Sequence, residues 1–114
     1  MSLLTDLMDM LGPIDIPIET GGFSGKPPDE YIVITPMSDR LGFYADNQAH
    51  NVIEEARLSL FTKRNYQALK KQLTKALLFG GMTITDRQYI GFENDTKYHH
   101  YAIDVLKEYE MEDE

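Results

Sequence analysis

The stretch TKRNYQALKKQLTKALLFGG, Thr62 to Gly81, predicts the one long helix of this chain. Its apolar residues recur at helical spacing and define one side: Tyr66, Leu69, Leu73, Ala76 and Leu77. Asn65 is placed to cap the amino end, and Gly80 and Gly81 supply the left-handed conformation that ends a helix. We expect the three leucines to pack on a sheet face that includes Val33, Leu58 and Ile103.

The segments before this helix have the composition of β-strands. YIVIT, Tyr31 to Thr35, predicts a central strand that Pro36 closes. RLGFYAD and VIEEARLSLF, residues 40–46 and 52–61, alternate between apolar and polar positions on either side of a polar turn at Asn47 to Asn51. This pattern predicts a hairpin.

After the helix, MTITDRQYIGF and YHHYAIDVL, residues 82–92 and 98–106, predict a second hairpin. The predicted fold class is therefore α+β: a mainly antiparallel sheet packed on one face by the long helix and a short N-terminal helix. That short helix is expected over Leu3 to Leu11, where apolar residues again follow helical spacing.

A chain of 114 residues is predicted to form one domain. Residues 1–30 would hold the N-terminal helix and an extended loop, residues 31–109 the α+β core, and residues 110–114 an acidic tail. Within the first part, IDIPI at Ile14 to Ile18 alternates, but Pro17 restricts it to a sheet edge or an extended connection. Glu19 to Glu30 is rich in glycine and proline and predicts a long loop.

Composition excludes several classes of site. The chain has no cysteine, so disulfides, thiol nucleophiles and cysteine-ligated zinc are excluded. There is no apolar run of about 18 residues, and the N-terminal segment carries Asp6 and Asp9 where a signal peptide would be basic and then apolar. We therefore expect a cytosolic protein that does not span a membrane.

Charge is unevenly distributed along the chain. The net charge is −8, from 11 basic and 19 acidic residues, which disfavours general attraction to nucleic acid or anionic lipid. Between Ala56 and Thr85 there are six basic residues and no acidic one, which leaves five basic against nineteen acidic elsewhere, or −14. The basic segment is either an electrostatic contact, for a phosphate backbone or for an acidic surface of another copy, or a solvated helix face balanced within the chain.

The stretch TKYHHYAIDVLKEY, Thr96 to Tyr109, contains two adjacent histidines. In a strand, His99 and His100 point to opposite faces, so together they cannot ligate one metal without a bulge. Glu93 and Asp95 precede them in a predicted hairpin turn, where turn geometry is the simpler explanation. The sequence also lacks the common phosphate-binding, serine-nucleophile and zinc-helix patterns, so no catalytic, cofactor-binding or metal-binding residues are predicted.

Three segments carry a resemblance to a known family: YIVITPMSDRLGFYADNQ, EEARLSLFTKRNYQALKKQLTKAL and MTITDRQYIGFENDTKYHHYAIDVLKEY. They resemble the tail-completion proteins, also called tail terminators or head-to-tail joining proteins, of prophages and long-tailed bacteriophages of Gram-positive hosts. The resemblance implies an α+β fold and a homo-oligomeric ring, of six copies, that caps the tail tube and meets the head connector. It implies neither enzymatic activity nor a cofactor.

The expected partners are thus other copies of the chain, the tail tube protein and the head connector protein, with DNA only passing through the ring. Its location would be the virion neck, and the host cytoplasm during assembly. Candidate subunit-interface residues lie on the long helix and in the predicted first hairpin turn: Lys70, Lys71, Lys75, Asp46, Asn47 and His50.

Two other classes remain open. One is a small metal-dependent or hydrolytic enzyme that uses His50, His99, His100 and nearby carboxylates. The other is an acidic protein-binding module, such as a nucleic-acid mimic.

Overall fold

The structure, a computed structural model, describes residues 2–21, 25–45 and 48–110, and the side chains of these residues except 40 and 42–50. Within them the chain forms helix α1 (Leu3–Leu11), a 3-10 turn (Gly12–Ile14), strands β1 (Ile18–Thr20), β2 (Glu30–Ala45) and β3 (Gln48–Thr62), helix α2 (Tyr66–Phe79), and strands β4 (Thr83–Phe92) and β5 (His99–Glu110). The sheet order is β1-β2-β3-β5-β4. β1 pairs with β2 in parallel, and the other neighbours are antiparallel. The predicted α+β class is confirmed.

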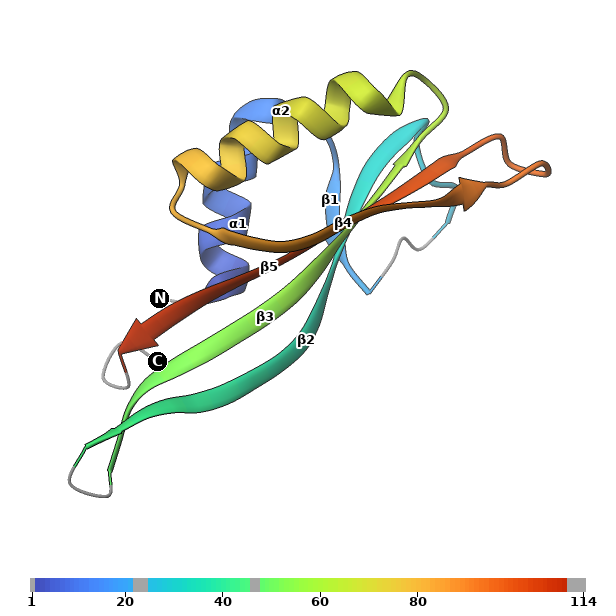
Figure 1. The fold of residues 1–114 in the computed structure, drawn as a ribbon. Coiled ribbons are helices and arrows are strands. Elements are labelled where there is room, and N and C mark those ends of the chain that lie inside the picture. The colour runs from blue at the N-terminus through green and yellow to red at the C-terminus, as the bar shows by residue number, and fades with distance from the viewer. Residues whose placement is uncertain (1, 22–24, 46–47, 111–114) are drawn as a thin grey trace.

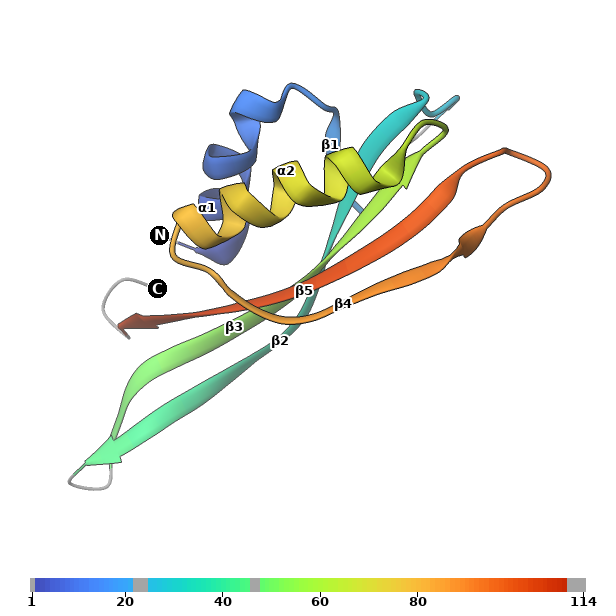
Figure 2. The same cartoon turned by 45° about the horizontal axis from the view of Figure 1, so that its top comes forward.

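Both helices pack on the same face of the sheet (Figures 1 and 2). Leucines at every fourth position of each helix are buried against it: Leu3, Leu7 and Leu11 of α1, and Leu69, Leu73 and Leu77 of α2. The sheet contributes alternate residues of its central strands: Ile32, Ile34, Leu58, Leu60, Ile103 and Val105. Each fully buried side chain of this size contributes about 1.5–3 kcal/mol, so this layer is the main source of stability.

Helix α2 begins and ends where its sequence predicts. The Asn65 side chain accepts a hydrogen bond of 3.0 Å from the Gln67 amide, which caps the amino end. Of the two glycines predicted to be left-handed, only Gly81 is, with φ +87°, while Gly80 keeps a φ of −79°. A single left-handed glycine is enough to end the helix.

Strand β2 does not end at Pro36, which corrects the prediction. It runs on to Ala45 with an irregularity between Pro36 and Ser38. The Ile32 amide donates to the Pro17 carbonyl on the β1 side (2.9 Å), and Pro36 has the same parity as Ile32. A backbone N–H at position 36 would therefore point toward the β1 side of the strand, where β1 pairs only with residues 32–34. Proline lacks this N–H, but no hydrogen bond to β3 depends on it, so the strand can continue through Pro36.

Two other details of the first hairpin differ from prediction. β3 already begins at Gln48, so most of Asn47 to Asn51 is strand rather than turn. Val33 is paired with Ser59 and lies on the face away from the helices, while Ile32 and Ile34 occupy the core. Leu58 and Ile103, the other two predicted members of the core face, are fully buried.

The N-terminal segment agrees with its prediction more closely. α1 spans Leu3–Leu11, and its amino end is capped by the Ser2 hydroxyl, which accepts from the Thr5 amide. Past Pro17 the chain forms the short edge strand β1, and β2 already begins at Glu30, so the predicted Glu19 to Glu30 loop is shortened by three residues.

The far ends of β2 and β3 extend past the helices as a two-stranded arm (Figure 1). The molecule measures 55 × 27 × 24 Å, with a radius of gyration of 15.5 Å, against about 13 Å for a compact domain of this length. The elongation gives this small chain a large surface relative to its core.

Candidate functional site

The outer side of α2 is basic at its centre and apolar at its end. Lys71, Lys75, Leu78 and Phe79 follow one another at spacings of four, three and one residues, so they share the side opposite the buried leucines. We call these four residues the α2 stripe. Leu78 is 57% exposed and Phe79 is 97% exposed. A phenylalanine in water beside two cations has the composition of a protein-binding surface.

Lys70 is placed differently from the other two predicted lysines. It is half-buried, and its Nζ lies 5.4 Å from the centre of the Tyr101 ring. A cation over an aromatic face is attracted to it, so Lys70 borders the core rather than lying clear of it. The sequence places all three lysines off the apolar side, which is correct for Lys71 and Lys75 only.

Part of the basic segment is balanced within the chain. Arg57 donates two hydrogen bonds to the Asp104 carboxylate, at 2.7 and 3.0 Å, and this pairing raises the pKa of the guanidinium. Lys63 lies 3.4 Å from an Asp29 oxygen and 5.0 Å from the centre of the Tyr98 ring. In the described part of the chain, neither Lys71 nor Lys75 has such a partner, so the charge of the α2 stripe is uncompensated.

The other candidate interface residues follow β2 in the sequence, in or next to its connection to β3. Asp46 and Asn47 lie outside the described residues, and so does the side chain of His50. Their part in an interface stays a prediction.

The two adjacent histidines occupy opposite faces of β5. Nδ1 of His99 is 3.0 Å from the Tyr89 hydroxyl on the helix side, where its ring also approaches Tyr66. His100 stacks on Phe61 on the other face, with ring centres 4.3 Å apart. The prediction that the two side chains point to opposite faces is confirmed. Among the described residues, no group of three or more His, Asp or Glu could hold a metal ion.

His100 is the more constrained of the two. Its Nε2 is buried and has no hydrogen-bond partner in the described part of the chain. Burial lowers the pKa of the imidazole, while nearby Glu93 raises it in part and Arg57 lowers it further. The neutral ring is therefore the favoured form in the folded protein.

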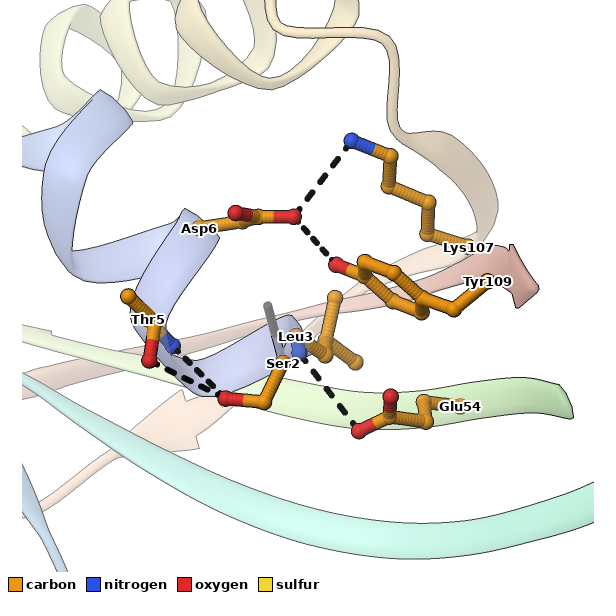
Figure 3. A network of polar contacts seen from close by, with 7 residues as sticks. All are labelled: Ser2, Leu3, Thr5, Asp6, Glu54, Lys107 and Tyr109. Atoms are coloured by element: carbon orange, nitrogen blue, oxygen red, sulfur yellow. Dashed lines mark hydrogen bonds and ion pairs between the residues drawn. The ribbon is translucent and has the colours of Figure 1, made fainter. Parts of the chain in front are cut away.

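A buried carboxylate joins α1 to the end of β5 (Figure 3). Asp6 is 8% exposed, and one of its oxygens accepts hydrogen bonds from the Tyr109 hydroxyl and from Lys107 Nζ, the latter at 3.4 Å. Burial, followed by the bond to Asp6, raises the pKa of the Tyr109 phenol. No motif in the sequence predicts this site, although Asp6 lies three residues after buried Leu3 and hence on the core side of α1.

A groove of about 350 Å³ lies between the start of α1 and the β2–β3 pair. Its walls include Leu4, Ile34 and Met37, and Asp39 and Glu54 line it as well. Glu54 also accepts a long hydrogen bond of 3.4 Å from the Leu3 amide (Figure 3). Apolar carbon next to carboxylates suits the stem and charged head of a lysine or arginine better than an anion.

The chain matches no protein-family model and no curated protein. Neither helix in the described residues has the length and apolar character needed to cross a membrane.

Proposed function

We propose that this chain is a structural protein of phage morphogenesis, whose copies form a ring that caps the tail tube and joins it to the head connector. The observation that carries the proposal is the α2 stripe, where two uncompensated lysines adjoin an almost fully exposed phenylalanine. The resemblance of the sequence to tail-completion proteins supplies the phage context.

The α2 stripe favours a ring over a two-fold dimer. Two copies that met through the same stripe would bring lysine against lysine, and this contact is repulsive. The rest of the chain, outside residues 56–85, carries five basic against nineteen acidic residues, so a different and acidic surface of the next copy is the better match. A contact between two different surfaces is heterologous, and a suitable rotation closes it into a ring.

The remaining partners follow from that position in the particle. The tail tube and the head connector would meet the two ends of the ring, and the candidate residues Asp46, Asn47 and His50 would contact one of them. The acidic excess repels phosphate, so DNA would pass through the ring without being held. The protein would reside in the host cytoplasm during assembly and then in the virion neck.

Deletion and complementation in the phage that encodes the chain test this function. Without the gene, lysates should contain filled heads and separate tails, and supplying the chain in trans should restore joined particles. A deletion that leaves heads joined to tails of normal length would contradict the proposal. Loss of an enzymatic step or of an early infection stage, with normal particles, would point to one of the other classes.

A further inference from the structure

The sheet has one face that no helix of the described residues covers (Figures 1 and 2). On this face, Val33, Ile53 and Leu106 are half-buried apolar side chains at positions that alternate with the core residues. We call it the open face. Antiparallel sheets can leave one face to water, but such a face is then usually polar throughout, whereas this one keeps aliphatic residues on three neighbouring strands.

Carboxylates dominate the described charges of the open face. The strand register places Glu19, Glu55, Asp86, Asp104 and Glu108 there. The described cations at this face are Arg57 and, at its far end over the Tyr98 ring, Lys63. Arg57 is already engaged by Asp104, with N–O distances of 2.7 and 3.0 Å. Ile53 and Leu106 are diagonal neighbours across β3 and β5, and we call this pair the aliphatic patch, whereas Val33 lies opposite Ser59, six residues along β3 from Ile53. The described part of the open face therefore combines the aliphatic patch with a net negative surround.

From these features we infer that the open face of one copy receives the α2 stripe of the next copy. The inference rests on the proposed ring function and names the two surfaces that meet in it. The chemistry is complementary: Lys71 and Lys75 would face carboxylates such as Asp86 and Glu108, while Leu78 and Phe79 would cover the aliphatic patch. Exposed aromatic anchors beside cations contribute most of the energy at such contacts.

The placement of the two surfaces supports a second copy as the occupant. α2 packs its leucines on the core face of the sheet, so the α2 stripe looks away from the sheet and the open face looks away from α2. The surfaces thus lie on opposite sides of one molecule, which suits head-to-tail addition of copies. Nucleic acid and anionic membrane fit poorly, because the carboxylates of the open face would repel phosphate.

Reciprocal charge reversal tests this contact. One variant carries Lys71→Glu and Lys75→Glu, and the other carries Asp86→Lys and Glu108→Lys; all four side chains are exposed, so the fold should tolerate both. Each variant alone would oppose like charges across every subunit contact, and we expect the concentration for half-maximal capping of purified tail tubes to rise about tenfold or more. An equimolar mixture of the two should recover capping, because alternating copies restore opposite charges at every contact.

Matched controls separate this effect from net charge. Lys26→Glu with Lys97→Glu changes the charge as the first variant does, and Asp9→Lys with Asp95→Lys changes it as the second does, at exposed positions outside both surfaces. These controls should cap tubes as the parent does, and thermal melting should show all four proteins folded. If a reversed variant melts early, Lys71→Ala with Lys75→Ala and Asp86→Ala with Glu108→Ala replace the reversals, and each should weaken capping by a smaller factor.

The outcomes distinguish the contact from the function. If the parent does not cap tubes, the proposed ring function fails and this inference fails with it. If the parent caps tubes and both reversed variants cap equally well, the contact is wrong while the function stands. Loss of capping by each variant without recovery in the mixture also overturns the pairing of these two surfaces.

Discussion

Asp6 is a charged side chain in the interface between α1 and the sheet, and its two partners make that position tolerable. Its carboxylate accepts bonds from Tyr109 and Lys107, residues about a hundred positions later in the chain. A buried carboxylate that keeps its hydrogen-bond donors lowers the stability of the fold only slightly. Removing the carboxylate or its donors leaves the remaining partner buried without a hydrogen bond, which is destabilising. Asp6 therefore holds α1 in one position on the sheet.

The Asp6→Ala variant should be less stable by about 1–3 kcal/mol, because the Tyr109 hydroxyl and the Lys107 ammonium lose their acceptor. The free energy of unfolding in denaturant measures this loss. Asp9→Ala is the matched control, since Asp9 lies on the exposed side of the same helix, and it should change stability by no more than about 0.5 kcal/mol. Equal losses in the two variants would show that the buried network contributes nothing specific.

His100 should make stability depend on pH. Burial lowers its pKa below the ordinary value of 6.5, so between that pH and the lower folded pKa the unfolded chain binds more protons than the folded one. Stability should then fall as the pH drops below about 6.5, and it should be unaffected by this group above that pH. The groups that face the ring are Phe61, Glu93 and Arg57.

The His100→Gln variant should remove this slope, leaving a flatter curve of unfolding free energy between about pH 6.5 and the range near pH 4 where carboxylates titrate. Urea unfolding at a series of pH values measures both curves. Parallel curves for parent and variant would mean that His100 titrates alike in the folded and unfolded chain.

At the scale of elements, α2 is the layer that closes the core, and Leu73 is its most central contact. Leu73 is fully buried, while Leu78, five residues later, is 57% exposed on the α2 stripe. Leu73→Ala should cost about 2–5 kcal/mol, because it removes buried carbon and leaves a cavity. Leu78→Ala should cost about 0.5 kcal/mol or less. Thermal or denaturant unfolding compares the pair, and a Leu73→Ala protein that melts with the parent would refute the packing described for α2.

Elements with a strong local signal could be predicted from the sequence. α2 has helical spacing, a capping asparagine and a terminal glycine, and β3 alternates strictly at Ala56, Leu58 and Leu60. β2 has a weaker signal. In YIVIT both sets of alternate residues are apolar, so the pattern could not decide that Ile32 and Ile34, rather than Val33, face the core.

Features that depend on distant neighbours could not be predicted. Pro36 is compatible with a continuing strand only because β1 is too short to pair with it. Asp6 is stabilised by Tyr109, which lies 103 residues later in the chain, and no local sequence pattern predicts that partner. Helical spacing predicts that Lys71 and Lys75 lie on the exposed side of α2. Phe79 follows Lys75 at the same spacing of four residues, so this spacing could also have predicted that Phe79 belongs to the candidate site.

For the whole molecule, a substitution at Phe79 tests assembly without changing the stability of the fold. It is 97% exposed, so Phe79→Ala should leave the free energy of unfolding within about 0.5 kcal/mol of the parent. If it anchors the contact between copies, its loss should weaken tube capping by about 2 kcal/mol, or roughly thirtyfold in concentration. Unlike the contribution of the lysines, this apolar contribution should persist at high salt.

Met8→Ala is the control for Phe79→Ala, because Met8 is 43% exposed on α1, outside both the α2 stripe and the open face. It should have no effect on capping. Equal effects of the two substitutions would assign the loss to general surface apolarity and not to the α2 stripe.

Electron cryomicroscopy of purified tail tubes incubated with the protein can show whether its copies close into a ring at the tube end. We expect one ring of six copies at one end of each tube, with the helices and the five-stranded sheet of this fold recognisable in every copy. Tubes with bare ends, or with protein bound along their length and no closed ring, would contradict this expectation.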